Sequence, residues 1–173
     1  MSSFKSQLVA KLGWRWQEGA TDDNRLVFEQ YFNEGNGENQ AEAVWHLSGQ
    51  ELGDGEDLTL DLTALTRTVL GDTLTTTFLT IKAIFIVNRS EEWGAELLVG
   101  GAAAYEWYYP FGGSGHIVSV PPDSPLLLCN RIWGWAVDDS NKNLLLEAAG
   151  GDVEFDIAII GTLTTSASGS SGD

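Results

Sequence analysis

Short apolar runs separated by turn-forming residues dominate the chain from residue 24 onward. The runs are rich in Val, Ile, Thr, Phe, Tyr and Trp, and clusters of Gly, Asn, Asp and Pro separate them at fairly even spacing. This pattern of strand-forming runs separated by turn-forming clusters is typical of all-β proteins. The pattern predicts strands over residues 25–32, 41–47, 58–62, 76–88, 95–99, 116–120, 126–129, 132–137, 143–148 and 153–161.

Strict alternation of apolar and polar residues is clearest in two of these runs. Residues 77–86 begin mixed and end apolar on both faces, and residues 153–157 alternate with one polar face. The turns between runs contain Asn36-Gly37, Asp54-Gly55 and Gly150-Gly151, which accept the positive φ angles of tight hairpins. We therefore predict an antiparallel β-sandwich or jelly roll, with a closed barrel as the alternative. Residues 62–70 could add a short helical turn between strands.

The N-terminal segment has a different pattern. Phe4, Leu8 and Leu12 recur every four residues behind Ser2 and Ser3, as on one stripe of a short capped helix. Residues 1–17 also hold three basic residues and no acid. We interpret residues 1–20 as a helical or extended basic arm. A terminal segment that folds onto its own core, or that frays, is the alternative.

These patterns divide the chain into three parts. The basic arm covers residues 1–20, and one β-sandwich domain is expected over residues 21–163. The last ten residues, 164–173, are small and polar and are predicted to form a flexible Ser/Gly-rich tail. A chain of 173 residues is long enough for one ordinary domain.

The net charge of the chain limits the classes of partner that it can bind. The chain has 9 basic and 25 acidic residues, a formal net charge of -16. The first 17 residues contribute +3, so the remaining 156 positions contribute -19. Such a body repels a phosphate backbone, and we expect no binding of nucleic acid. The aliphatic and aromatic run over residues 83–87 is far shorter than the roughly 18 residues of a membrane helix, so no membrane association is expected.

Residues that could carry catalysis or hold a metal are scarce. Cys129 is the single cysteine, and His46 and His116 stand in no recognised ligand spacing. His46 is expected to face outward from a strand and His116 to stand at a strand entry. Acidic pairs such as Asp138-Asp139 could hold calcium or serve a glycosidase, but residues 139–143 lack the Gly and Glu that an EF-hand loop requires later in its sequence. We expect no metal, no cofactor and no enzymatic activity.

Aromatic residues are the most unusual feature of the second half. Trp133 and Trp135 are spaced by two and should share one face of a strand, most simply in the core. Aromatic rings dominate protein interfaces as well as cores. We therefore interpret Trp93, Trp107, Tyr108 and Tyr109 as a candidate surface contact for a sugar or a protein.

Several segments together resemble a group of small virion proteins of tailed bacteriophages. The resemblance covers roughly residues 25–161 and rests on four motifs. These are a glycine turn with Asn-Gln-Ala at residues 35–45, an Asp-Leu strand at 58–62, an Ile-Lys strand at 78–88, and the closing segments 133–137 and 155–161.

The resemblance implies a structural protein of the virion, a capsid decoration or cement protein on the outer head surface, with a tail component as the alternative. The partner would be the major capsid protein or another virion protein, with assembly in the host cytoplasm. We expect a homo-oligomer, with a trimer favoured, and an acidic outward face that discourages uncontrolled association. The basic arm lies outside the resemblance, and we expect it to anchor the protein to the shell through Phe4, Lys5, Leu8, Lys11, Leu12 and Arg15. The alternative function is a carbohydrate-binding or host-attachment module of the tail.

Overall fold

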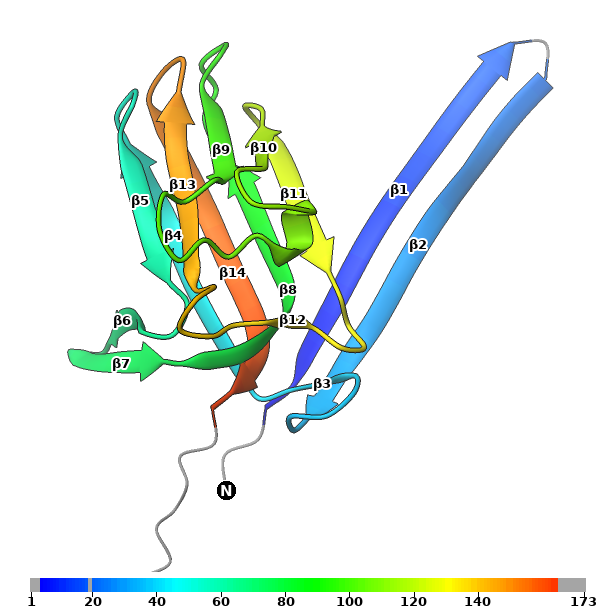
Figure 1. Cartoon of the computed structure of the whole chain (residues 1–173). Coiled ribbons are helices and arrows are strands. Elements are labelled where there is room, and N and C mark those ends of the chain that lie inside the picture. Colours follow the sequence, from blue (N-terminus) through cyan, green and yellow to red (C-terminus); the bar gives the residue numbers. More distant parts are fainter. Residues whose placement is uncertain (1–3, 19, 165–173) are drawn as a thin grey trace, which may run out of the picture.

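The computed structural model describes residues 4–18 and 20–164, and almost all of its regular structure is β-strand (Figure 1). A single turn of 3-10 helix, η1, occupies Tyr109–Phe111. The strands are β1 (Ser6–Glu18), β2 (Ala20–Glu34), β3 (Gln40–Ala41), β4 (Ala43–Leu52), β5 (Asp57–Asp61), β6 (Leu65–Val69), β7 (Asp72–Thr76), β8 (Phe78–Asn88), β9 (Glu96–Gly100), β10 (Ile117–Val120), β11 (Ser124–Cys129), β12 (Trp135–Ala136), β13 (Asn143–Ala149) and β14 (Val153–Leu163).

Two antiparallel sheets form the body of the molecule. One has the strand order β10-β9-β13-β5, and the other has the order β11-β8-β14-β4, with β12 paired to β8. Within the described residues no strand of one sheet pairs with a strand of the other, so the arrangement is a sandwich and not a closed barrel. The predicted all-β sandwich is confirmed, whereas the finer assignment as a jelly roll stays a prediction.

The sandwich core follows from the alternation in the sequence. Every second residue of β13 is buried, beginning with Leu144, and β14 buries Val153, Phe155, Ile157 and Ile159 in the same way. Because successive side chains on a strand point to opposite faces, each strand presents one apolar row to the facing sheet. These rows form one continuous core together with Trp45 and with the apolar side chains of β8 and β9.

A long hairpin projects from one end of the sandwich. β1 and β2 pair antiparallel without a bulge, from Ser6 opposite Phe32 to Glu18 opposite Ala20. Figure 1 shows the two strands leaving the body near β3 and diverging from the sandwich along their length. The projecting unit therefore ends at Glu34, and the expected division after residue 20 falls within β2.

The base of this hairpin is attached to the outer face of the larger sheet. Leu8 and Phe32 are buried in a small second cluster that includes Ala83, Leu127 and Ile160. This contact fixes where the hairpin leaves the body.

A buried lysine reinforces the attachment from the neighbouring loops. Lys82 on β8 donates from Nζ to the carbonyl of Ile132 at 2.8 Å and to the carbonyl of Gly37 at 3.3 Å. Burial lowers the pKa of this ammonium group, and nearby Glu38 partly offsets the effect. The loop after β2 and the loop after β11 are therefore held by one side chain.

Three sequence predictions need correction. The helical alternative for the N-terminal segment is wrong, because β1 is extended and pairs along its whole length with β2. Residues 62–70 form no helical turn; β6 pairs with β7 as a short hairpin instead. Only Trp135 and Ala136 of the strand predicted at 132–137 are in a strand, because the residues before them form a turn. Of the predicted tail, only Thr164 is within the described residues.

Candidate functional site

The projecting hairpin has two chemically different faces. Residues directly opposite each other in an antiparallel pair have their side chains on the same face. The register therefore places the even-numbered residues of β1 and β2 on one face and the odd-numbered residues on the other. We call these the even face and the odd face of the hairpin.

The even face is apolar and largely open to solvent beyond the base. The exposed fractions are 65% for Leu12, 40% for Trp14, 58% for Trp16, 67% for Leu26 and 45% for Phe28. Water-exposed apolar side chains are ordinary when scattered, but a contiguous patch of large ones is typical of an interaction site. The five residues lie on two paired strands, so the patch is contiguous.

One hydrogen bond links a tryptophan of the even face to its neighbour strand. Trp14 donates from Nε1 to Oδ2 of Asp22 at 3.0 Å. The bond joins β1 to β2 and restricts the position of the ring before any partner binds. A ring held in place in advance loses less rotamer entropy on binding.

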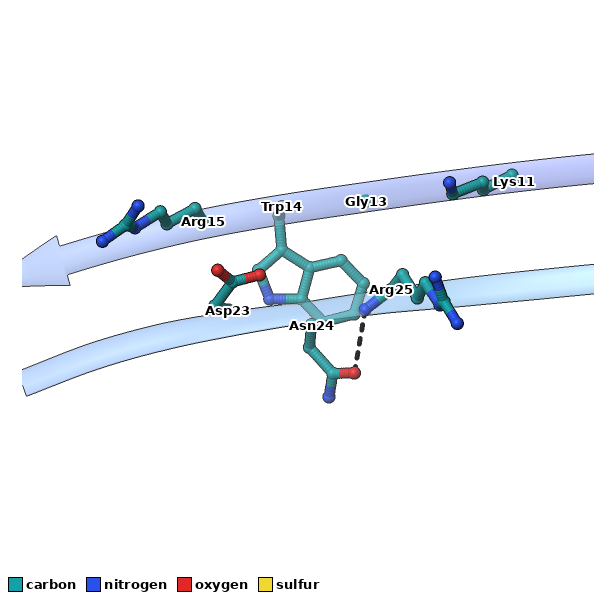
Figure 2. Close-up of a pocket in the computed structure, with 7 residues that line it drawn as sticks. All are labelled: Lys11, Gly13, Trp14, Arg15, Asp23, Asn24 and Arg25. Atoms are coloured by element: carbon teal, nitrogen blue, oxygen red, sulfur yellow. Dashed lines mark hydrogen bonds between the residues drawn. The ribbon is translucent and has the colours of Figure 1, made fainter.

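The odd face carries the basic side chains, and Val9, Val27 and Tyr31 are also exposed on it. Lys11 and Arg15 of β1 and Arg25 of β2 are all exposed, and Gly13 between them contributes no side chain (Figure 2). These residues line a shallow hollow together with Asp23 of the odd face and with Trp14 and Asn24 of the even face. No ion pair to any of the three basic groups occurs in the part of the chain that the structure describes. The hollow therefore presents cationic groups that are free to meet an anionic surface.

The predicted anchor residues separate into three groups. Leu8 is buried and Phe4 is half-buried against the body, so these two attach the hairpin to its own sandwich and must be removed from the anchor set. Leu12 is exposed on the even face. Lys11 and Arg15 are exposed on the odd face, and Lys5 is exposed just before β1. Sequence reasoning missed Trp14, Trp16, Leu26 and Phe28, although Trp14 and Trp16 share their even numbering with Leu8 and Leu12.

The predicted aromatic contact surface is wrong for Trp107. Its ring is buried in the sandwich core, edge-on to Phe111 and Trp135, and Nε1 donates to the carbonyl of Ala136 at 2.8 Å. Trp93 is 97% exposed, so it remains available for contact.

The remaining aromatic predictions have mixed outcomes. Tyr108 and Tyr109 lie beside each other with ring centroids 5.0 Å apart, Tyr108 half-buried and Tyr109 exposed. Trp133 is exposed on a turn, while Trp135 is half-buried in β12. The pair therefore does not form one row of the core, because Trp133 precedes the strand.

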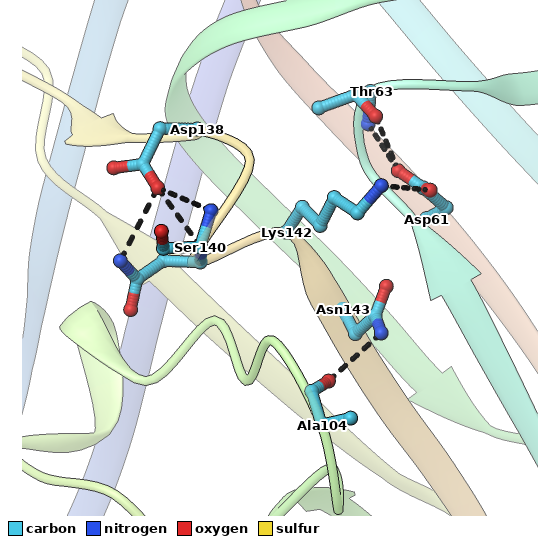
Figure 3. Close-up of polar contacts among 8 residues, drawn as sticks. Asp61, Thr63, Ala104, Asp138, Ser140, Lys142 and Asn143 are labelled. Atoms are coloured by element: carbon cyan, nitrogen blue, oxygen red, sulfur yellow. Dashed lines mark hydrogen bonds and ion pairs between the residues drawn. The ribbon is translucent and has the colours of Figure 1, made fainter.

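Acidic residues at one end of the sandwich serve the loops of the fold (Figure 3). Asp138 accepts hydrogen bonds from the backbone amides of Ser140 and Asn141, and the first of these bonds is the main cause of its lowered pKa. Lys142 pairs with Asp61 at 2.9 Å. The Asp138 carboxylate therefore closes its own turn, and the Asp61 carboxylate forms an ion pair with Lys142.

The other candidate chemical groups are not brought together. Within the described residues, no group of three or more His, Cys, Asp or Glu side chains is gathered as metal ligands would be. His46 is exposed on β4, as predicted, and His116 is exposed just before β10. The ring of His116 lies 3.0 Å through Nδ1 from the carbonyl of Phe111, which ties it to its own loop.

Comparison with known proteins gave no match among protein-family models, curated proteins or solved structures. In residues 4–18 and 20–164, no helix has the length and apolar character needed to cross a bilayer.

Proposed function

We propose that this protein is a structural subunit of a bacteriophage virion, a capsid decoration protein that binds the outer surface of the head shell through its projecting hairpin. The observation that carries the binding role is the open apolar face of Leu12, Trp14, Trp16, Leu26 and Phe28. The virion as the setting is supported by the resemblance of residues 25–161 to small virion proteins.

The distribution of charge agrees with a division between an adhesive part and a solvated part. Residues 1–34 hold four basic and five acidic residues, a net charge of -1, whereas residues 35–173 hold five and twenty, a net charge of -15. Like charges on the bodies oppose close contact between them. The nearly neutral hairpin can approach another protein surface without that repulsion.

Shortening the hairpin on purified particles tests this proposal. Ala10 is opposite Phe28, so joining these residues through an Asn-Gly turn removes the distal hairpin and keeps the base. Deleting residues 2–16 alone would instead leave β2 without its partner. We expect particles assembled with the shortened chain to lose most of its copies, as measured by quantitative mass spectrometry. Full retention, or absence of the wild-type chain from the particles, would contradict the proposal.

The carbohydrate-binding alternative retains Trp93, Tyr108 and Tyr109 but loses Trp107, since that ring is buried. Glycan binding that disappears with Trp93→Ala and survives shortening of the hairpin would favour it. The substitution Trp107→Ala would report on stability instead.

A further inference from the structure

We propose that the odd face of the hairpin binds a second copy of this chain, at an acidic patch on the outer face of that copy's smaller sheet. The smaller sheet is the one with the strand order β10-β9-β13-β5. The inference goes beyond the proposed function, because it joins neighbouring copies and leaves the even face to the shell. It is supported by the charges of the two surfaces, by their dimensions and by their positions on opposite sides of the molecule.

Three basic residues on the odd face form a compact cationic group. Arg25 is opposite Gly13, so it is a diagonal neighbour of both Lys11 and Arg15 on β1. Diagonal neighbours on one face of a sheet are about 7–8 Å apart. Among the described residues, none of the three is in an ion pair. Asp23 lies opposite Arg15, so three positive charges and one negative charge leave the group a net charge of +2.

The acidic patch consists of Asp57 on β5, Glu147 on β13 and Glu96 on β9. Asp57 is directly opposite Glu147, and Ala149, two residues further along β13, is opposite Glu96. Ala148, between Glu147 and Ala149, is buried in the core between the sheets. Because side chains alternate along a strand, the three carboxylates therefore lie on the outer face of the smaller sheet.

The fold leaves the charge of this patch without a counter-ion. Like charges directly opposite each other destabilise a sheet, which is the case for Asp57 and Glu147. No ion pair to any of the three carboxylates occurs within residues 4–18 and 20–164. Glu96 accepts a hydrogen bond from the hydroxyl of Ser119 at 2.6 Å, which does not neutralise it. A partner that brings cations to the patch would offset the repulsion.

The cationic group and the acidic patch have similar dimensions. Lys11 and Arg15 are four residues apart on β1, a span of about 14 Å. Asp57 and Glu96 are separated by two strand spacings and two residues, a span of about 12 Å.

Each surface also has an apolar side chain beside its charges. Val27, next to Arg25, is 46% exposed, and Leu98, opposite Glu147, is half-buried. The contact can therefore combine ion pairs with burial of apolar area, which exposed ion pairs alone would not provide.

The two surfaces lie on opposite sides of the molecule. At the base of the hairpin, Leu8 and Phe32 pack against Ile160 of the larger sheet. The even face is therefore directed toward its own body and the odd face away from it, while the acidic patch is on the far side of the sandwich. A copy cannot make this contact with itself, so the contact between copies is head-to-tail. Contacts of this kind build a ring or an open chain.

Reversing the charge on each side and then mixing the variants tests the contact. The hairpin variant is Lys11→Glu with Arg25→Glu, and the sheet variant is Asp57→Lys with Glu96→Lys; all four side chains are exposed. In sedimentation velocity at high micromolar concentration, we expect the wild type to associate and each variant alone to remain a single copy. An equimolar mixture of the two variants should associate again, because each hairpin then meets a patch of opposite charge.

The wild type alone provides a second measurement that requires no variant. Raising the NaCl concentration from about 50 mM to about 500 mM should weaken its association roughly tenfold, since salt screens exposed charges.

Two control variants show whether the effect belongs to these surfaces. Leu26→Glu adds a charge next to Arg25 but on the even face, and it should associate as the wild type does. Asp72→Lys with Asp139→Lys changes the net charge by +4, as the sheet variant does, at exposed positions outside the patch. It should also associate. Equal urea midpoints for all variants would show that a loss of association is not a loss of folding.

Four results would overturn the inference. They are a wild type of one copy at low salt, association that salt does not weaken, a mixture of folded variants that stays at one copy, and equal losses for Leu26→Glu and the hairpin variant. A wild type of one copy whose hairpin variant is lost from particles would assign the odd face to the shell instead.

The inference and the proposed function can fail separately. A wild type of one copy that is still lost from particles when its hairpin is shortened would remove the head-to-tail contact and leave the proposed function standing. Charge-dependent association in solution, with the chain absent from particles, would do the reverse.

Discussion

Tryptophan residues in this protein have opposite roles that depend on where the strands place them. Trp107 is enclosed by the core and satisfies its indole N–H with a backbone carbonyl, whereas Trp93 is almost fully exposed on the loop before β9. Composition alone shows seven tryptophans, but their roles follow from burial. The Trp14 and Trp16 rings on the hairpin belong to neither case, because they are large, partly exposed and on one face.

Substituting Trp107 and Trp93 by alanine should separate these roles. We expect Trp107→Ala to lower the free energy of unfolding by about 3–5 kcal/mol, because it leaves a cavity and an unpaired carbonyl. Trp93→Ala should change it by less than about 0.5 kcal/mol, as is usual for an exposed side chain. Urea denaturation followed by circular dichroism measures both. Equal losses in the two variants would contradict the burial assigned to Trp107.

At the scale of elements, the sandwich strands could be predicted and the hairpin could not. Residues 153–157 of β14 alternate apolar and polar residues, and burial of one row of side chains decides the structure of β13 and β14. In β1 the spacing of Phe4, Leu8 and Leu12 fits a helix stripe and also every second position of one strand face. Ala10, Trp14 and Trp16 complete the even row and favour the strand, but the decisive fact is pairing with β2, which is a contact between segments.

In the candidate site, too, some features can be read from neighbouring residues in the sequence, and others depend on contacts between distant segments. The basic residues of the arm were visible in the sequence as an excess of charge. The even face was not, since Leu26 and Phe28 join Leu12 and Trp14 only through the register of the hairpin. Residues 132–137 were misread for a related reason, because the turn before Trp135 is held by Lys82 from another strand.

The hairpin should be dispensable for folding of the sandwich. In the chain shortened between Ala10 and Phe28, Leu8 and Phe32 still cover Leu127 and Ile160. We expect its free energy of unfolding, measured in urea at low protein concentration, to match the wild-type value within about 0.5 kcal/mol. A much larger loss would mean that the distal hairpin stabilises the body, and the loss of binding could then be a consequence of unfolding.

At the scale of the whole molecule, the free energy of unfolding should depend on a few carboxylates whose ionised form is stabilised by hydrogen bonds and ion pairs in the folded state. The pKa of Asp156 is lowered below its ordinary value of 3.8, chiefly by the backbone N–H of Gly49 and then by Arg89, which lies at 2.8 Å. A carboxyl whose pKa is lower in the folded state contributes stability that is complete above its unfolded pKa. This contribution is lost as the pH falls through the folded pKa.

Comparing the wild type with Asp156→Asn across acid pH tests this linkage. We expect the wild type to be more stable at neutral pH, and the difference in urea midpoint to shrink as the pH falls below about 4. A matched substitution at Asp139, which makes no ion pair among the described residues, should show a smaller change with pH. A difference for Asp156→Asn that is constant from neutral pH to strong acid would contradict the assigned cause.

The proposed attachment to the head shell would cover the distal hairpin in the assembled particle. Hydroxyl-radical footprinting with mass spectrometry, on particles and on dilute free protein, measures this at single tryptophans. We predict that oxidation of Trp14 and Trp16 falls strongly in the assembled state, while that of Trp93, on the body, changes little. Equal oxidation of Trp14 and Trp16 in the two states would contradict the central claim.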